Sequence, residues 1–401
     1  MTATGAATGL AARTKEVDPA GVDLVAFAGD DGVLFERDGY GLAGRGVALR
    51  APAADAAAVL AAIDADDEVR RPGTGPVAFG ALPFRPDAAG EAVVPAVIVG
   101  RARDGTAWRT VVGDAAPPHA PAPVRRRPPD DFRLTAARPH DEWLEVIAEA
   151  VAAIRAGRLR KVVLAREVTV EANRPVLPLD VMARLRALYP SCMLFSVDGF
   201  VGASPELLVS RRGDAVRSQP MAGTIPRSGD PDVDARLAAA LLASGKDRHE
   251  HAMVVDAVAA ALRPHCSSLD VPAEPSIVPL RNVSHLGTVV SGRLDGAGPS
   301  ALDLAFLLHP TPAVGGTPTG AALAYIAEAE GLDRGRYAGP VGWMDARGDG
   351  EWAVGVRSAE LDGNRARLFA GVGVVADSDP ELELAETQLK LQALLAAVVR
   401  P

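Results

Sequence analysis

Short apolar runs bounded by turn-forming residues dominate this chain and most constrain its fold. They gather in groups, and amphipathic stretches with a helical period lie between the groups. Runs such as 22–28, 95–100, 192–197 and 200–204 are typical of strands. This grouping predicts an α+β protein with large, mostly antiparallel β-sheets flanked by helices. No GxGxxG or P-loop motif follows a strand, so nucleotide binding has no support in the sequence.

Residues 114–131 concentrate proline and arginine without an apolar period, which predicts an extended connector. The connector divides the chain into residues 1–130 and 131–401. The first part contains one alanine-rich stretch, near 53–65, that predicts a helix, but no polar constellation that indicates chemistry. Candidate functional residues therefore lie after the connector.

The second part predicts a regular series of elements. Helices are expected over 141–156, 231–244, 246–263 and 380–398, with one more ending before Pro190. Strands are expected over 161–172, 192–197, 200–204, 206–212, 352–361 and 366–375.

Two pairs of carboxylates, Asp247/Glu250 and Glu383/Glu386, stand three residues apart within predicted helices. That spacing places each pair on one helix face. Four carboxylates on facing helices repel one another unless a cation lies between them, and oxygen ligands favour magnesium. The pattern predicts a divalent metal site, although each pair taken alone also fits a solvated helix face.

Composition excludes several classes of function. A net charge of −9 and an aromatic content of 4% argue against nucleic-acid binding. The sequence shows no apolar run of twenty residues and no signal-peptide pattern, which predicts a cytoplasmic protein without a membrane segment. Cys192 and Cys266 match no metal spacing, and the histidines show no HxxxH or HExxH pattern, so zinc is not expected.

Two ionisable residues adjoin apolar strands. Lys161 begins an apolar strand, where reduced solvation would allow it to act as a base, although a lysine at a strand end often simply reaches solvent. Glu206 follows Pro205 between apolar runs, where a carboxyl can stay protonated and donate that proton. A glutamate on an edge strand facing water is the alternative for Glu206.

Other residues favour the binding of an acid. Gly223 and Thr224 are expected in a turn whose N–H groups and hydroxyl could hold a carboxylate, or in an ordinary turn. Arg357 and Tyr337 could clamp an acid together, or Arg357 could be structural.

A set of motifs resembles one known family. Its members, in chain order, are KVVLAR, GASPELL, MAGT, KDRHEH, HLGT, LHPTPA, RYAGPVGW, VRSA and GVGVVADSDPELELAETQLK. Over about residues 137–395 the chain resembles the chorismate-utilising enzymes, which include isochorismate, salicylate, anthranilate and aminodeoxychorismate synthases. The resemblance implies a pair of large antiparallel sheets flanked by helices, with 131–401 as the chorismate-binding domain. It also implies that 1–130 packs into the same fold.

The resemblance implies roles for the site residues. Direct Mg²⁺ ligands would be Glu250 and Glu386, with Asp247 and Glu383 acting through water. The ring carboxylate of chorismate would be held by Lys390, Gly223 and Thr224. The enolpyruvyl carboxylate would be held by Arg357, Tyr337, Gly371 and Gly373, and His285 would lie against the ring.

Three positions imply a branch of the family. Lys161 stands where members that add water carry lysine, whereas anthranilate synthases carry glutamine and use ammonia. Ala222 replaces the nucleophilic lysine of aminodeoxychorismate synthases, and Ala313 stands where salicylate synthases tend to have threonine. The resemblance thus implies an enzyme that converts chorismate to isochorismate without a glutamine amidotransferase subunit. The sequence shows no coiled-coil seam and no swapped-strand signal, which favours a monomer.

In the implied reaction, Lys161 deprotonates water for attack at C2 and Glu206 protonates the departing C4 hydroxyl. Two alternatives stay open. A salicylate synthase would also eliminate pyruvate, and a catalytically silent subunit of the family would bind ligand without turnover.

Overall fold

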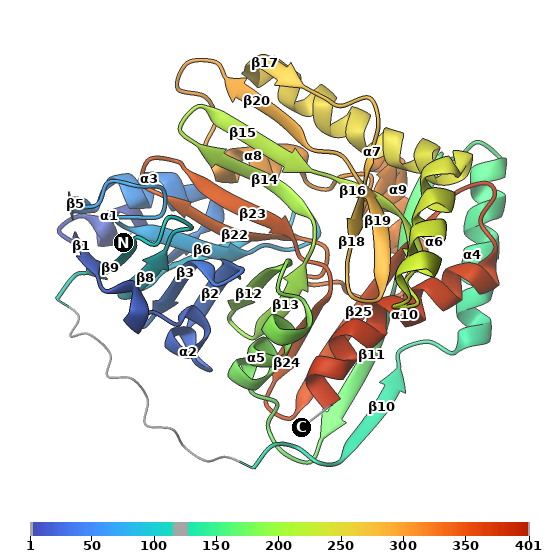
Figure 1. The fold of residues 1–401 in the computed structure, drawn as a ribbon, viewed down its shortest axis with the longest axis horizontal. Helices are drawn as coiled ribbons and strands as arrows, with labels where there is room; N and C mark the ends of the chain where they lie inside the picture. Colours follow the sequence, from blue (N-terminus) through green and yellow to red (C-terminus); the bar gives the residue numbers. More distant parts are fainter. Residues whose placement is uncertain (1–2, 115–126, 400–401) are drawn as a thin grey trace.

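The computed structural model describes residues 3–114 and 127–399, which form two large β-sheets and one small sheet with helices around them (Figure 1). The larger sheet has 13 strands in the order β10-β11-β25-β24-β13-β12-β2-β3-β8-β9-β1-β5, with β21 beside β11. The second has 9 strands, β17-β20-β15-β14-β23-β22-β6-β7-β4, and the third has 3, β16-β19-β18. β1 and β5 pair in parallel, whereas the other strand pairs of the described ranges are antiparallel. The predicted α+β class with large, mostly antiparallel sheets is confirmed.

The strands before the connector are β1 (Ala11–Val17), β2 (Val33–Arg37), β3 (Tyr40–Arg45), β4 (Leu49–Pro52), β5 (Asp64–Asp67), β6 (Val77–Ala81), β7 (Glu91–Val94), β8 (Val97–Arg101) and β9 (Ala107–Val112). The next eight are β10 (Phe132–Ala136), β11 (Lys161–Ala172), β12 (Met193–Val197), β13 (Phe200–Ser204), β14 (Leu207–Arg212), β15 (Ala215–Gln219), β16 (Met221–Pro226) and β17 (Cys266–Asp270). The last eight are β18 (Ser276–Pro279), β19 (Val283–Gly287), β20 (Val290–Leu294), β21 (Gly316–Thr317), β22 (Pro340–Asp345), β23 (Gly350–Val354), β24 (Ser358–Asp362) and β25 (Arg365–Val374).

The α-helices are α1 (Ala3–Ala7), α2 (Leu24–Ala28), α3 (Ala56–Ala61), α4 (His140–Arg155), α5 (Pro178–Leu188), α6 (Pro231–Ala243), α7 (Gly245–Leu262), α8 (Ala301–Leu308), α9 (Thr319–Ala329) and α10 (Pro380–Val399). Short 3-10 turns span Pro19–Gly21, Ala53–Asp55 and Arg263–His265. Within the described ranges, no helix combines the length and the apolar character that crossing a membrane requires.

Strands from both sides of the connector share the large sheets. β2 pairs with β12 in the 13-stranded sheet, and β6 pairs with β22 in the 9-stranded sheet. Most of the connector itself, residues 115–126, lies outside the described residues. Its predicted extended form stays a prediction.

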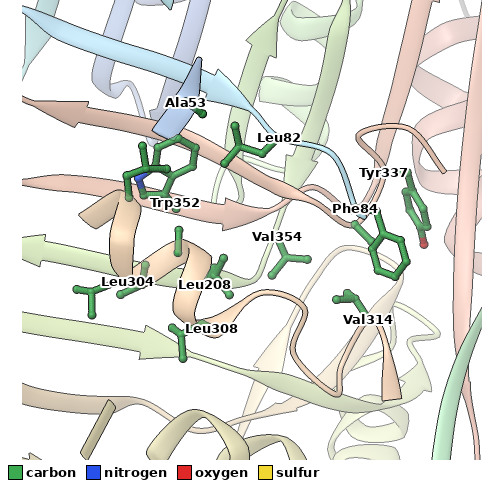
Figure 2. Packing of buried hydrophobic residues seen from close by; sticks show 14 of the residues in the cluster. Ala53, Leu82, Phe84, Leu208, Leu304, Leu308, Val314, Tyr337, Trp352 and Val354 are labelled. Carbon is green, nitrogen blue, oxygen red and sulfur yellow. The ribbon is translucent and has the colours of Figure 1, made fainter. Parts of the chain in front are cut away.

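The core fills the space between the two large sheets and the space beneath the helices. Apolar side chains of β2 and β3 in one sheet and of β6 and β22 in the other form one buried cluster. A second cluster lies where α2, α5 and α10 pack on the 13-stranded sheet. A third and larger cluster includes α8 and β23 and reaches Tyr337 and Phe84 (Figure 2).

Two elements of the first third differ from prediction. The apolar run 22–28 is not a strand: it contains helix α2, because the Asp23 carboxylate accepts hydrogen bonds from the Val25 and Ala26 N–H groups and so caps a helix start. The helix expected over 53–65 ends at Ala61, because the chain turns at Ala62 to enter β5.

The prediction of a single strand over 352–361 is wrong. The segment is two strands, β23 in the 9-stranded sheet and β24 in the 13-stranded sheet. The chain passes from one sheet to the other through residues 355–357, and Arg357 adopts a left-handed φ of 53°. Alternating apolar residues on both sides of the crossing look like one strand in the sequence, because a change of sheet leaves no mark on hydrophobic period.

We expect Trp352→Ala to lower the free energy of unfolding by about 3–5 kcal/mol, because it would open a void where the indole is 1% exposed. The buried Nε1–H of Trp352 has no hydrogen-bond partner. Trp352→Phe removes that unpaired donor and leaves only a small void, so it should lower the free energy of unfolding clearly less than Trp352→Ala. Urea denaturation of both variants checks this, and equal losses would contradict it.

Candidate active site

One cavity gathers every residue that the sequence singled out, and its volume is about 100 Å³. The lining residues from the prediction are Lys161, Glu206, Gly223, Thr224, Asp247, Glu250, His285, Ala313, Tyr337, Arg357, Gly371, Gly373, Glu383, Glu386 and Lys390. They come from β11 and β25 of the 13-stranded sheet, β16 and β19 of the small sheet, helices α7 and α10, and loops. The volume is below the roughly 300–1,000 Å³ usual for ligand pockets, and three lysine side chains extend along the walls.

Lys161 opens β11 and is 1% exposed. Its Nζ lies 2.8 Å from Glu250 Oε1 on α7. Gly373 on β25 makes this contact possible, because a Cβ at that position would lie 2.4 Å from Glu250 Oε1 and 3.0 Å from Lys161 Cε. The buried pair therefore depends on the absence of a side chain on the neighbouring strand. Lys161 does not reach bulk solvent, unlike the strand-end lysine that was the alternative.

Two further lysines pair with acids from α10. Lys246 Nζ lies 3.4 Å from Glu383 Oε1, and Lys390 Nζ lies 2.5 Å from Glu386 Oε1. The remaining acid, Asp247, accepts a hydrogen bond from the Ser244 hydroxyl. Every one of the four predicted carboxylates thus has a donor from the protein.

Burial raises the pKa values of Asp247 and Glu383, and neighbouring carboxylates raise them further. For Glu386, burial acts in the same direction, but Lys390 and Thr224 outweigh it and the pKa is lowered. Lys246 lowers both pKa values but does not cancel the effects of burial and of the neighbouring carboxylates. An added cation would relieve this repulsion.

The type of donor atom in this set suits a divalent ion. The four acids are carboxylates from two helices that line one wall, and hard divalent ions take oxygen ligands. In the described parts of the chain, however, no three His, Cys, Asp or Glu side chains stand close enough together to hold a metal ion. Glu250 and Glu386 point to lysines instead, so metal binding would require them to exchange a lysine for the ion.

Glu206 precedes β14 and is 7% exposed. Its backbone is fixed on both sides, since its N–H donates to the Ser204 hydroxyl and its carbonyl accepts from the Val354 N–H. Burial raises the pKa of Glu206 to about 7. Glu206 is therefore a buried carboxyl that can carry a proton near neutral pH, and the alternative of a water-facing edge glutamate is wrong.

His285 on β19 connects three predicted residues. Its Nδ1 lies 3.2 Å from the Gly223 carbonyl oxygen and 3.1 Å from Thr224 Oγ1, and its Nε2 lies 3.3 Å from Arg357 Nη2. Burial lowers the pKa of His285 to about 3, so the ring is neutral. Because a carbonyl only accepts and a guanidinium only donates, Nδ1 carries the proton and Nε2 accepts from Arg357.

Arg357 lies at the point where the chain crosses from the 9-stranded sheet to the 13-stranded sheet. No carboxylate lies within ion-pair distance of its guanidinium among residues 3–114 and 127–399, and its described partner is the neutral His285. An uncompensated guanidinium in a cavity is suited to bind the carboxylate of a ligand.

Tyr337, Lys390 and Gly371 complete this side of the cavity. The Tyr337 ring stacks on Phe369 with centroids 5.0 Å apart, and burial raises the pKa of its phenol. Lys390 Nζ donates to the Gly371 carbonyl at 3.0 Å. Ala313 lies in the loop after α8, and its N–H donates to Thr311 Oγ1.

Two charged residues of the cavity were not predicted: Lys246 and Arg334. Lys246 stands beside Asp247 in the KDRHEH motif and could have been found as the cation facing an acid on α10. Arg334 stands three residues before Tyr337, and its role depends on the positions of β11 and of the 311–315 loop, which the sequence does not reveal.

The two large sheets hold Lys161, Glu206 and Arg357 around a small cavity lined by acids. This arrangement is that of an enzyme that binds a small acid. Residues 118–399 match the model of the chorismate binding enzyme family, and the chain belongs to that family. Over 341 residues it is 43% identical to the putative isochorismate synthase MenF of Mycobacterium tuberculosis, covering 82% of this chain and 88% of that protein.

Solved structures agree with that assignment. The putative 2,3-dihydroxybenzoate-specific isochorismate synthase DhbC of Bacillus anthracis superimposes with a TM-score of 0.78 at 35% identity, covering 92% of this chain and 96% of that one. The menaquinone-specific isochorismate synthase MenF of Escherichia coli gives 0.84 at 26% identity, covering 98% and 95%.

We expect Glu206→Gln to stabilise the protein more at pH 8 than at pH 5. The folded-state pKa of about 7 lies above the ordinary value of 4.5, so the wild type loses stability as pH rises between these values and retains the full cost of a buried charge above them. Glutamine carries no such cost. The gain in free energy of unfolding should therefore be larger at pH 8 than at pH 5, by at most about 3 kcal/mol. Urea denaturation at both pH values checks this. Glu381→Gln, at an exposed position on α10, is the control, and a gain for Glu206→Gln that does not change with pH would contradict the assignment.

Proposed function

We propose that this protein is an isochorismate synthase, which converts chorismate to isochorismate for menaquinone or siderophore biosynthesis. One observation carries the proposal most directly. Lys161, a buried lysine, and Glu206, a buried carboxyl that holds its proton to about pH 7, line the same cavity as Arg357. A base, an acid and a free cation for a carboxylate are what a hydroxyl exchange on a dicarboxylate ring requires.

In the proposed reaction, Lys161 in its neutral form takes a proton from water as the water oxygen bonds to C2. Both ring double bonds shift by one position, the C4–O bond breaks, and Glu206 gives its proton to the departing hydroxyl, which leaves as water. One water enters and one leaves, so the reaction is an isomerisation. In the return direction Lys161 and Glu206 exchange roles.

The remaining residues hold the substrate. Arg357, oriented by the neutral His285, and Tyr337 bind the enolpyruvyl carboxylate, while Lys390 and Thr224 face the ring carboxylate. Glu250 and Glu386, supported by Asp247 and Glu383, would hold Mg²⁺. The ion would compensate the ring carboxylate's charge and act as a Lewis acid toward it.

Three features support this member of the family over others. Lys161 suits water as nucleophile, so we propose that no glutamine amidotransferase subunit is needed. Gly223 and Thr224 lie in strand β16 rather than in the predicted turn, and Ala222 leaves no lysine nucleophile beside them. Ala313 leaves a small, apolar side chain at the cavity wall. We further propose that the protein acts as a monomer in the cytoplasm.

The first experiment incubates the protein with chorismate and Mg²⁺, resolves the products by chromatography and assays pyruvate. We expect isochorismate without pyruvate, and a loss of kcat of at least about 10³-fold in Lys161→Ala, because the base and an activated water are removed together. Lys15→Ala, at an exposed lysine, is the control. Full turnover by Lys161→Ala would refute the proposed base. Salicylate with equimolar pyruvate would identify a salicylate synthase, and no product would favour a silent subunit.

Glu386→Ala should weaken Mg²⁺ binding by at least about tenfold, since it removes one of the proposed ligands. Isothermal titration with Mg²⁺ in the presence of chorismate measures this directly, independently of turnover. Glu381→Ala, on the same helix but exposed, should bind as the wild type does. If Glu386→Ala bound Mg²⁺ unchanged, the ligand assignment would be wrong.

A further inference from the structure

A buried ion pair takes the place of a strand along the edge of β11. β10 pairs with β11 from Val168 onward, and the chain at 315–317 pairs with its first residues. Between these stretches the edge is completed by side chains. The Val163 carbonyl accepts from Arg334 Nη2 at 2.7 Å, and the Ala165 N–H donates to Glu330 Oε1 at 2.7 Å. Glu330 and Arg334 pair with each other, at 2% and 3% exposure.

The same guanidinium also holds the loop that leads into β21, the short strand that pairs with the start of β11. Arg334 Nη1 donates to the Val314 carbonyl at 2.8 Å, next to Ala313. Arg334 Nε donates to Glu330 Oε2 at 2.9 Å, which fixes the plane of the fork. One rigid group therefore joins the strand two residues from Lys161 to the loop that presents Ala313. Val163, Ala313, Val314 and Arg334 all line the catalytic cavity.

A residue from the N-terminal third covers this ion pair. The Arg334 guanidinium carbon lies 4.1 Å from the centroid of the Phe84 ring, and the Phe84 N–H donates to the Gly335 carbonyl at 2.9 Å. The Phe84 carbonyl accepts from His309 Nε2 at 2.8 Å. Phe84, Val314 and Tyr337 belong to one buried cluster and gather at one end of it in Figure 2. On its far side the pair lines a second cavity, of about 780 Å³, between residues 83–88 and α9.

We propose that Arg334, held by Glu330, is a positioning residue that adds to the backbone pairing of 315–317 with β11 and fixes Lys161 relative to the Ala313 loop. The inference rests on the proposed function, in which Lys161 is the base. A base must lie within hydrogen-bond reach of the water it activates, and a misplacement of about 1 Å can cost about 100-fold in rate. Arg334 touches neither reacting atom in this scheme and acts through the two segments that it joins.

Arginine is needed at this position because one side chain must donate hydrogen bonds to three separate groups at once. Its planar fork donates to two carbonyls and to a carboxylate at once, in a fixed geometry. Lysine keeps the charge but concentrates its donors on one atom, so it cannot reach Val163, Val314 and Glu330 together. A lysine would leave at least one buried carbonyl without a donor and release the segment to which that carbonyl belongs.

The test compares Arg334→Lys and Glu330→Gln with the wild type in the chorismate assay. We expect kcat to fall about 10- to 100-fold while KM changes less than about threefold. The double variant should be no slower than the slower single variant, because the two residues act as a unit. Arg347→Lys is the matched control, since Arg347 also bonds to an acid and to a backbone carbonyl but lies in the β22–β23 turn away from the cavity.

Chemical rescue separates positioning from simple stabilisation. Guanidinium at millimolar concentration should restore part of the kcat of Arg334→Ala, entering through the second cavity, whereas ammonium should not, and Arg347→Ala should not respond. If Arg334→Ala does not fold, the near-isosteric Glu330→Gln decides the matter through its separate kcat and KM values.

Two results would overturn the inference. One is a kcat within twofold of wild type in folded Arg334→Lys and Glu330→Gln. The other is a loss of activity that matches the unfolded fraction measured by thermal denaturation, with no guanidinium rescue. A wild-type protein that makes no isochorismate would instead refute the proposed function, and the inference with it.

Discussion

The burial of many like charges in one small cavity is the constraint on which the site's architecture depends. Four carboxylates leave bulk water together, and each has a hydrogen-bond or ion-pair donor from the protein that offsets part of the cost. Lys161 of β11 meets Glu250 of α7, and Lys246 of α7 meets Glu383 of α10. These contacts link β11 to α7 and α7 to α10. The carboxylates and lysines that hold these elements together line the same cavity as Arg357, and the four carboxylates are those proposed above to hold a metal ion.

Much of this arrangement is readable from the sequence because it is carried by local signals. β11 runs over the predicted residues, from Lys161 to Ala172, since the apolar run 162–165 and the alternation of apolar and polar residues over 167–172 are typical of a strand. The i,i+3 spacing of acids in α7 and α10 places each pair on one face, and a cavity does lie beside both faces. The ordered set of motifs then links segments that no periodicity could bring together. The roles assigned to individual residues still rest on that resemblance.

What the sequence did not reveal depends on distant neighbours. The change of sheet at 355–357 looks like a continuous strand, although it is what presents Arg357 to the cavity. Arg334 looks like one more arginine beside a glycine, because its partners, the carbonyls of Val163 and Val314, belong to segments fixed only by tertiary structure. α2 was mistaken for a strand since five apolar residues fit either element, and the Asp23 cap decided between them. Backbone atoms as partners leave no trace in side-chain patterns.

The sharing of both sheets by the two ends of the chain has a consequence for synthesis on the ribosome. Phe35 of β2 pairs with Phe195, and Phe79 of β6 pairs with Trp343, so the first strands to emerge must wait for partners made much later. At roughly 5–20 residues per second, β6 stays without that neighbour for about 10–50 s. Its apolar edge is open to wrong pairing throughout that time. The yield of folded protein should therefore depend on translation speed as well as on the stability of the finished fold.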